Sequence, residues 1–337
     1  MKTLLRWSLT LLVVALLAWW GWYNFDLAEL NAQVRALARV SPWLVGVLGL
    51  MFLVMRAFQG EVFRYATRSL GARLGRYEAF MLAMVISLTN LVLPRVGMGA
   101  PAVYLKARHG LRYADFASLL LPTVILQLTC IGVVGLGCQL WLCAAMDLAW
   151  IWWQTAAMVG LIALSMLGLT RPPAPPEAWQ GRLANFVRRF LASWSVLRRD
   201  RKLVLVVLVL QAAVLLAQGL RLWGCFYALE QAARDNWQYP VAGIMLVSFF
   251  SHLVVLVAPT PGGLGFREVA ILLGASSLLH VPPEAAMGAA LLDRAVMTVC
   301  AVAVGGVGMV QFIVPARREA AASATESPDE PDTQAKP

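Results

Sequence analysis

The chain has 337 residues, of which 60% are hydrophobic and 14% charged, and its mean hydropathy is +0.70. This composition excludes an ordinary soluble domain and predicts an all-α protein that crosses a membrane several times. The formal net charge of +10 would suit a nucleic-acid-binding protein, but the cations cluster between apolar segments, as in the cytoplasmic loops of membrane proteins. We therefore expect no nucleic-acid partner.

The first apolar segment follows Lys2 and Arg6 and has the charge pattern of a signal peptide. It is long for that role, ends in aromatic residues and has no cleavage site of small residues directly after it. We interpret it as a retained first helix over residues 4–23. Further segments of about 20 residues, the length that crosses a hydrocarbon core of ~30 Å, follow at 41–60, 114–140, 149–169, 203–224 and 284–314.

Two other apolar segments, at about 79–105 and 241–280, are interrupted by glycine and proline. A broken helix in lipid exposes backbone N–H and C=O groups, which are tolerated only inside protein or beside a wet cavity. A matched pair of breaks therefore indicates a transporter site. The residues that break the helices are Pro94, Pro259 and Pro261.

The charges of the loops predict how the chain is threaded. Loops 61–78 and 171–202 are rich in arginine and are assigned to the cytoplasmic side. Loops 24–40, 141–148 and 225–240 have few cations or balance them with acidic residues, so we assign them to the outside. With these assignments, both termini are expected in the cytoplasm.

This threading places both ends of segment 79–105 on the inner side of the membrane and both ends of segment 241–280 on the outer side. It predicts an inverted-repeat helical bundle with two re-entrant helical hairpins of opposite orientation. The first repeat covers about 41–140 and the second about 203–314, within one transmembrane domain over 1–315. The alternative is that every limb crosses fully, which gives about ten spans.

Two segments lie outside the repeats. The tail over residues 316–337 is too polar to bury a core and is predicted to be disordered. The cytoplasmic basic loop 171–202 starts with a proline-rich stretch and continues with apolar residues at helical spacing among arginines. That pattern favours an interfacial helix on anionic lipid, and a solvated basic connector is the alternative.

The second break contains the residues with the clearest chemical implication. Gly262, Gly263 and Gly265 allow a tight backbone without side chains. The helix that begins near Leu264 would direct free N–H groups and the positive end of its dipole toward the middle of the bilayer. Such a helix end can bind phosphate, and Arg267 could add a charge-assisted contact to the same anion.

Ionisable residues at membrane depth are costly and are usually paired or functional. Pairing of Glu268 with Arg294, or of Asp293 with Arg267, would hold the hairpin against the last helix, either alone or together with a binding role. Arg95 of the first break adds a third arginine to Arg267 and Arg294. The three arginines outnumber the two carboxylates by one, which favours an anionic substrate. The candidate substrate-binding residues are Arg95, Gly97, Gly262, Gly263, Gly265, Arg267, Glu268, Asp293 and Arg294.

The histidines and cysteines show no metal-binding pattern. The three histidines are scattered, and the five cysteines lie in or beside apolar segments without CxxC spacing. We interpret both sets as packing residues and expect no metal and no cofactor. They are His109, His252 and His280, and Cys130, Cys138, Cys143, Cys225 and Cys300.

Residues 260–268, with the sequence TPGGLGFRE, and the later Leu-Leu-Asp-Arg at 291–294 resemble the signature of the lysylphosphatidylglycerol synthase transmembrane family. Residues 90–105 resemble the other motif of this family, which includes the flippase half of multiple peptide resistance factors and many stand-alone membrane proteins. The likeness covers most of residues 1–315. It implies a lipid translocase fold with two oppositely inserted hairpins, which moves an aminoacylated phospholipid or another lipid-linked anion between leaflets.

The leading hypothesis is an integral membrane lipid translocase in the bacterial cytoplasmic (inner) membrane, with anionic or lipid-linked membrane lipids as partners. An intramembrane lipid-modifying enzyme is an alternative, but His109 and Asp115 are one residue too far apart for an acyltransferase motif. No catalytic residue is predicted, and we expect no aminoacyl-transfer domain after Pro315. A non-transporting scaffold, or a homo-oligomer packed through glycines, also fits the sequence.

Overall fold

The computed structural model describes residues 35–325, with gaps at 36, 93–98, 112, 147–151, 171–199, 234–239 and 259. The predicted first helix over 4–23 and almost all of the basic loop 171–202 lie outside the described residues. Every element within the described part is helical and none is a strand, which confirms the predicted all-α class.

The helices have the following bounds. They are α3 (Pro42–Arg68), α4 (Arg76–Val92), α5 (Gly99–His109), α6 (Tyr113–Met146), α7 (Trp152–Thr170), α9 (Arg201–Ala233), α10 (Val241–Val257), the 3-10 turn η1 (Pro261–Gly263), α11 (Phe266–Leu279), α12 (Pro283–Gly308), the π-helical turn η2 (Met309–Ile313) and α13 (Val314–Thr325).

Four helical stretches among the described residues are long and apolar enough to cross a membrane. They coincide with four of the predicted spans and cover Pro42–Arg68, Pro122–Ala144, Arg201–Gln231 and Pro283–Glu319. The predicted span 149–169 corresponds to α7, whose apolar core is shorter.

Apolar side chains on the outer faces of these helices support the membrane assignment. On α9, Leu205, Val209, Leu216 and Leu220 are exposed and recur at helical spacing, so they form one stripe. A helix that is apolar on its outer face as well as its packed face is typical of a membrane span. We infer that this stripe of α9 faces lipid.

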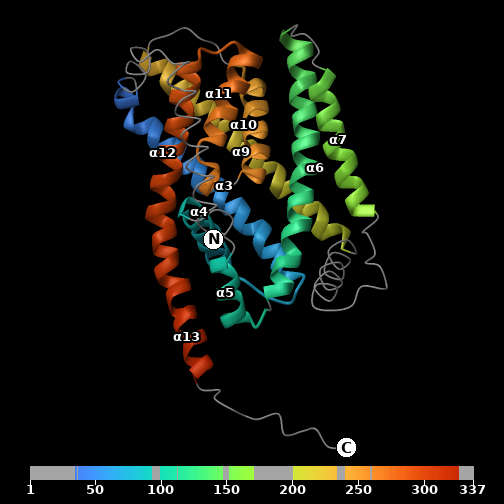
Figure 1. Ribbon diagram of the computed structural model, residues 1–337, viewed down its shortest axis with the longest axis vertical. Helices are drawn as coiled ribbons and strands as arrows, with labels where there is room; N and C mark the ends of the chain where they lie inside the picture. Colours follow the sequence, from blue (N-terminus) through green and yellow to red (C-terminus); the bar gives the residue numbers. More distant parts are fainter. Residues whose placement is uncertain are drawn as a thin grey trace, which may run out of the picture.

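The bundle is built from pairs of neighbouring helices. Helix α3 packs on α9, α4 on α12, α6 on α7, and α10 on α11. In Figure 1, α10 and α11 lie in the upper half of the view, whereas α4 and α5 lie below them and α6 and α7 stand together to one side. The turn η1 between α10 and α11 contacts α4, so the second break reaches the helix that precedes the first break.

The predicted cytoplasmic segments come together at one end of the bundle. A core cluster there joins the start of α4, helix α5, the start of α6 and the end of the last long helix through Leu82, Leu105, Phe116 and Ala316. Convergence of loops 61–78 and 106–112 with the segment after α12 agrees with their shared assignment to one side.

The structure corrects the predicted start of the disordered tail. Helix α13 extends to Thr325, so residues 316–325 are ordered, and residues 326–337 lie outside the described part. Two contacts explain the order: Ala316 is fully buried, and Glu319 forms an ion pair of 2.9 Å with Arg108. The segment is also rich in alanine, the residue with the highest helix propensity.

Helix α12 approaches α4 closely through two glycines. A Cβ atom on Gly305 would lie 2.7 Å from the main-chain oxygen of Met84, and one on Gly308 would lie 3.1 Å from that of Met81. A Cβ on Gly306, the residue between them, would meet no atom within 4 Å. The backbones of α12 and α4 can therefore touch only because Gly305 has no side chain.

A carboxylate network joins α4 to α5. The hydroxyl of Tyr104 donates to Glu78 Oε1 at 2.7 Å, His109 Nε2 lies 3.0 Å from the same oxygen, and the amide of Gly75 donates to Oε2 at 3.0 Å. Partial burial works to raise the pKa of Glu78, but these hydrogen bonds outweigh it and lower the pKa below its usual value.

Through this network, the stability of the fold depends on pH. A carboxyl with a lowered folded-state pKa stabilises the fold above its unfolded pKa, and that stability is lost as the pH falls through the folded value. We expect wild type to exceed Glu78→Gln in thermal stability at pH 7 and the difference to shrink below about pH 4.3, the usual Glu value. Melting curves of both proteins in detergent at several pH values measure this difference in stability. A difference that does not change with pH would contradict the prediction.

Candidate functional site

The second break is a tight turn that requires glycine. Gly262, Gly263 and Gly265 have φ angles of 56°, 68° and 82°, in the left-handed region that disfavours residues with a Cβ atom. The hydroxyl of Thr260 donates to the carbonyl of Leu264 at 2.9 Å and closes the turn. The break therefore has a defined backbone geometry rather than a loose loop.

Helix α11 begins with its first turn occupied by an acidic side chain. The amide of Gly265 donates to Glu268 Oε2 at 2.8 Å. Arg294 of α12 lies 3.3 Å from Glu268 Oε1 and also donates to the carbonyl of Gly262 at 3.0 Å. The helix end that we expected to present free N–H groups to phosphate is thus partly satisfied by Glu268.

Asp293 is the centre of a buried charge network. Its side chain is fully buried, and it forms ion pairs with Arg267 of α11 and with Arg221 of α9, the latter at 2.8 Å. Both pairs that the sequence suggested, Arg267 with Asp293 and Arg294 with Glu268, are present. They hold α11 against α12, and Arg221 adds a third helix that the sequence did not indicate.

A cavity of about 460 Å³ adjoins this network. Its walls come from α3, α4, α6, α9, α10, η1, α11 and α12, so it lies at the centre of the bundle. Much of the surface is apolar and includes Phe52, Met55, Ile86 and Leu256. The volume lies in the range of about 300–1,000 Å³ typical of small-molecule sites.

Of the predicted binding residues, Gly262, Gly263 and Arg267 line the cavity. Glu268, Asp293 and Arg294 belong to the adjoining ion-pair network rather than to the lining. Gly265 caps α11 beside it. The remaining candidates, Pro94, Arg95, Gly97 and Pro259, lie outside the described residues.

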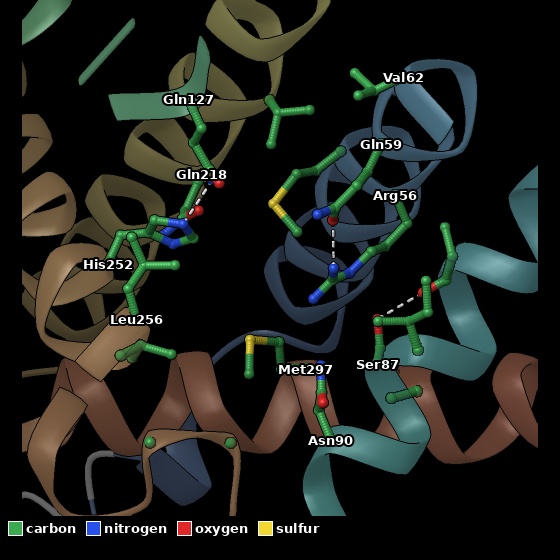
Figure 2. A pocket seen from close by; sticks show the side chains of 18 of the residues that line it. Arg56, Gln59, Val62, Ser87, Asn90, Gln127, Gln218, His252, Leu256 and Met297 are labelled. Carbon is green, nitrogen blue, oxygen red and sulfur yellow. Dashed lines mark hydrogen bonds between the residues drawn. The ribbon is translucent and has the colours of Figure 1, made fainter. Parts of the chain in front are cut away.

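Arginines form one wall of the cavity. Arg56 of α3 donates to Gln59, and its guanidinium lies 5.0 Å from the centre of the Phe52 ring. The guanidinium of Arg221 lies 5.4 Å from the same ring, so Phe52 contacts two cations. The Nε atoms of Arg56 and Arg221 are buried and have no hydrogen-bond partner in the described part of the chain. Figure 2 shows Arg56 and Gln59 directed toward the cavity.

Neutral polar groups line the opposite side. Gln127 of α6 and Gln218 of α9 are hydrogen-bonded to the two ring nitrogens of His252 on α10, at 2.7 and 3.4 Å. Figure 2 shows these three side chains across the cavity from Arg56 and Gln59. His252, interpreted from the sequence as a packing residue, is indeed hydrogen-bonded, but it also lines the cavity.

Sequence reasoning missed Arg56 and Arg221, although both lie inside segments predicted to span the membrane. The rule that ionisable residues at membrane depth are paired or functional would have selected them. Gln127 and Gln218 give a weaker signal because a neutral amide costs less to bury than a charge. Among the described residues, no group of three His, Cys, Asp or Glu side chains is placed to hold a metal ion.

Comparison with known proteins agrees with the fold and the motifs. Residues 7–305 match the family described as the lysylphosphatidylglycerol synthase TM region. A curated relative from Haloferax volcanii, named Glycosyltransferase AglD, is 28% identical over 313 residues, which covers 82% of this chain and 50% of the relative. The chain thus spans about half the length of that protein. Because the family match covers most of the sequence, the chain belongs to the family of the lysylphosphatidylglycerol synthase TM region.

Proposed function

We propose that the protein is a lipid translocase that moves an anionic phospholipid or lipid-linked precursor between leaflets through the central cavity. The observation that carries this proposal is a cavity at the centre of a membrane bundle, with arginines on one wall and apolar side chains around it. A lipid headgroup needs a polar site at this depth, and its acyl chains need apolar surroundings.

The charge balance at the site supports an anionic guest. Arg56, Arg221, Arg267 and Arg294 lie in or beside the cavity, and two carboxylates, Asp293 and Glu268, face the last three through ion pairs. Within the described residues, the cluster therefore carries two more positive than negative charges. Buried unpaired cations are costly, and a phosphate that entered the cavity would offset that cost.

The lengths of the helices around the breaks support two re-entrant hairpins in an inverted repeat. Helix α10 has 17 residues and α11 has 14, whereas α4 has 17 and α5 has 11. At 1.5 Å per residue, α11 is about 21 Å long and α5 about 17 Å, less than a hydrocarbon core of ~30 Å. In the proposed topology, α4 and α5 insert from the cytoplasm and α10 and α11 from outside, with both termini cytoplasmic in a bacterial inner membrane.

The relative named a glycosyltransferase raises the alternative of an enzyme. The geometry around His252, the one imidazole in the described lining of the cavity, does not favour it, because both ring nitrogens contact amides rather than a nucleophile or carboxylate. We therefore propose transport without catalysis and include lipid-linked sugar phosphates among the substrates to test. Formation of a new lipid product by the purified protein would decide for the enzyme.

Arg56→Gln provides the test of the translocase. Arg56 forms no ion pair with a described carboxylate, so its removal leaves no such group unpaired. A charge-assisted hydrogen bond contributes about 1.5–3 kcal/mol, so we expect transport of labelled phosphatidylglycerol to fall roughly 10- to 100-fold. The measurement is leaflet exchange in proteoliposomes, followed by quenching of a fluorescent lipid from outside.

The matched control is Arg68→Gln at the exposed end of the same helix α3, where transport should equal that of wild type. If wild type moves no anionic lipid in the panel faster than protein-free vesicles exchange it, the translocase proposal is wrong. Equal transport rates for wild type and Arg56→Gln would contradict the proposal that the lipid passes through the cavity.

A further inference from the structure

We infer that the cavity selects a lipid whose headgroup combines a phosphate with hydroxyl groups, such as a glycerol- or sugar-phosphate, and excludes a headgroup that carries an added amine. This inference rests on the proposed function and names the substrate class of the same site. Three features of the cavity carry it: the absence of an acidic residue from its described lining, the Arg56 guanidinium on its cationic wall, and the neutral amides opposite.

The lining residues of the cavity, all in the described part of the chain, include no aspartate and no glutamate. The neighbouring carboxylates are already engaged, Asp293 by two arginines and Glu268 by Arg294 and the amide of Gly265. An ammonium group brought into the cavity would therefore lose its hydration without gaining a carboxylate partner. A buried charge without such a partner costs several kcal/mol.

The cationic wall offers guanidinium donors to a guest. Arg56 lines the cavity and forms no ion pair with a carboxylate among the described residues. Its Nε atom is covered by protein, so a guest would meet the terminal nitrogens of the guanidinium. A phosphate offers acceptors to these donors.

The opposite wall is neutral and can both donate and accept. Gln127 and Gln218 each carry an amide N–H₂ group and a carbonyl oxygen, and His252 holds both amides in place by hydrogen bonds. Such groups match hydroxyls, which also donate and accept, better than they match a phosphate or an ammonium group. Because this wall faces Arg56 and Gln59 across the cavity (Figure 2), one headgroup can contact both.

The experiment compares three lipids that carry the same labelled acyl chain in proteoliposomes of the full chain. Phosphatidylglycerol has a phosphate and hydroxyls, phosphatidic acid has a phosphate without hydroxyls, and lysyl-phosphatidylglycerol carries added amines. We expect exchange of phosphatidylglycerol to be at least 10-fold faster than exchange of the lysyl lipid. Gln127→Ala/Gln218→Ala should slow phosphatidylglycerol about 10-fold and leave phosphatidic acid nearly unchanged, whereas Arg56→Gln should slow both.

Gln139→Ala on the same helix α6 is the matched control, because Gln139 is buried but does not line the cavity. A second variant, Gln127→Glu, adds a carboxylate to the neutral wall without shortening a side chain. It should raise the rate for the lysyl lipid relative to that for phosphatidylglycerol, and thus tests selectivity even if the double alanine variant fails to fold.

The outcomes separate the two proposals. Equal or faster exchange of the lysyl lipid by wild type would overturn the selectivity and leave the translocase intact. An unchanged lipid ratio in Gln127→Glu would also overturn it. Exchange of none of the three lipids above the rate of protein-free vesicles would instead contradict the translocase itself.

Discussion

Asp293→Asn is expected to destabilise the protein more strongly than Glu78→Gln or Arg56→Gln. The carboxylate of Asp293 is fully buried and pairs with Arg221 and Arg267, which are themselves 1% and 4% exposed. Its neutralisation leaves two buried cations without their counter-ion. Breaking a buried ion pair costs about 3–5 kcal/mol, and unfolding of detergent-solubilised protein by heat or denaturant measures the loss.

Two controls separate burial from charge in this prediction. Glu319→Gln removes one partner of the half-exposed pair with Arg108, and exposed pairs contribute at most about 1 kcal/mol. The triple variant Arg221→Met/Arg267→Met/Asp293→Leu replaces the network with apolar groups and should recover most of the stability. If Asp293→Asn has the same melting temperature as wild type, the network does not stabilise the fold.

The second large effect is expected from Gly305→Ala. The added Cβ atom would lie 2.7 Å from the main-chain oxygen of Met84 and 3.0 Å from Cβ of Leu88. A main-chain oxygen cannot rotate away, so α12 and α4 must separate. Overpacking of this kind costs about 1–3 kcal/mol, and we expect a lower melting temperature despite the better helix propensity of alanine.

Gly306→Ala is the matched control on the same helix. Its Cβ meets no atom within 4 Å, so the helix propensity of alanine, up to about 1 kcal/mol better than that of glycine, acts alone. Gly306→Ala should therefore melt at the same temperature as wild type or higher. Equal melting temperatures for the two alanine variants would contradict the close approach of α12 and α4.

Local sequence patterns predicted the elements well and their assembly only in part. Length and hydropathy located four spans, because a helix that crosses lipid needs a long apolar segment wherever it packs. The pairs of Arg267 with Asp293 and of Arg294 with Glu268 were foreseeable because a charge in lipid requires a counter-charge. The same rule would have selected Arg221 but not its partner, because Asp293 lies on a helix 72 positions later in the chain.

The cavity itself could not be read from the sequence. Gln127, Gln218 and His252 come from three different helices, and no periodicity within one segment shows that they meet. The position of α13 was missed for a similar reason. The polar composition after Pro315 suggested disorder, whereas Ala316 is ordered by contact with the distant helix α5 and its neighbours.

The connections of Arg294 bear on how access to the cavity can change. This one side chain binds Glu268 of α11 and the carbonyl of Gly262 in η1, while Asp293 beside it binds α11 and α9. A hinge between these elements would separate the buried ion pairs and leave charged side chains without partners in a medium of low dielectric constant. We infer that these ion pairs and this hydrogen bond hold α9, η1, α11 and α12 together as one unit, because separating any of them would leave a buried charge without its partner.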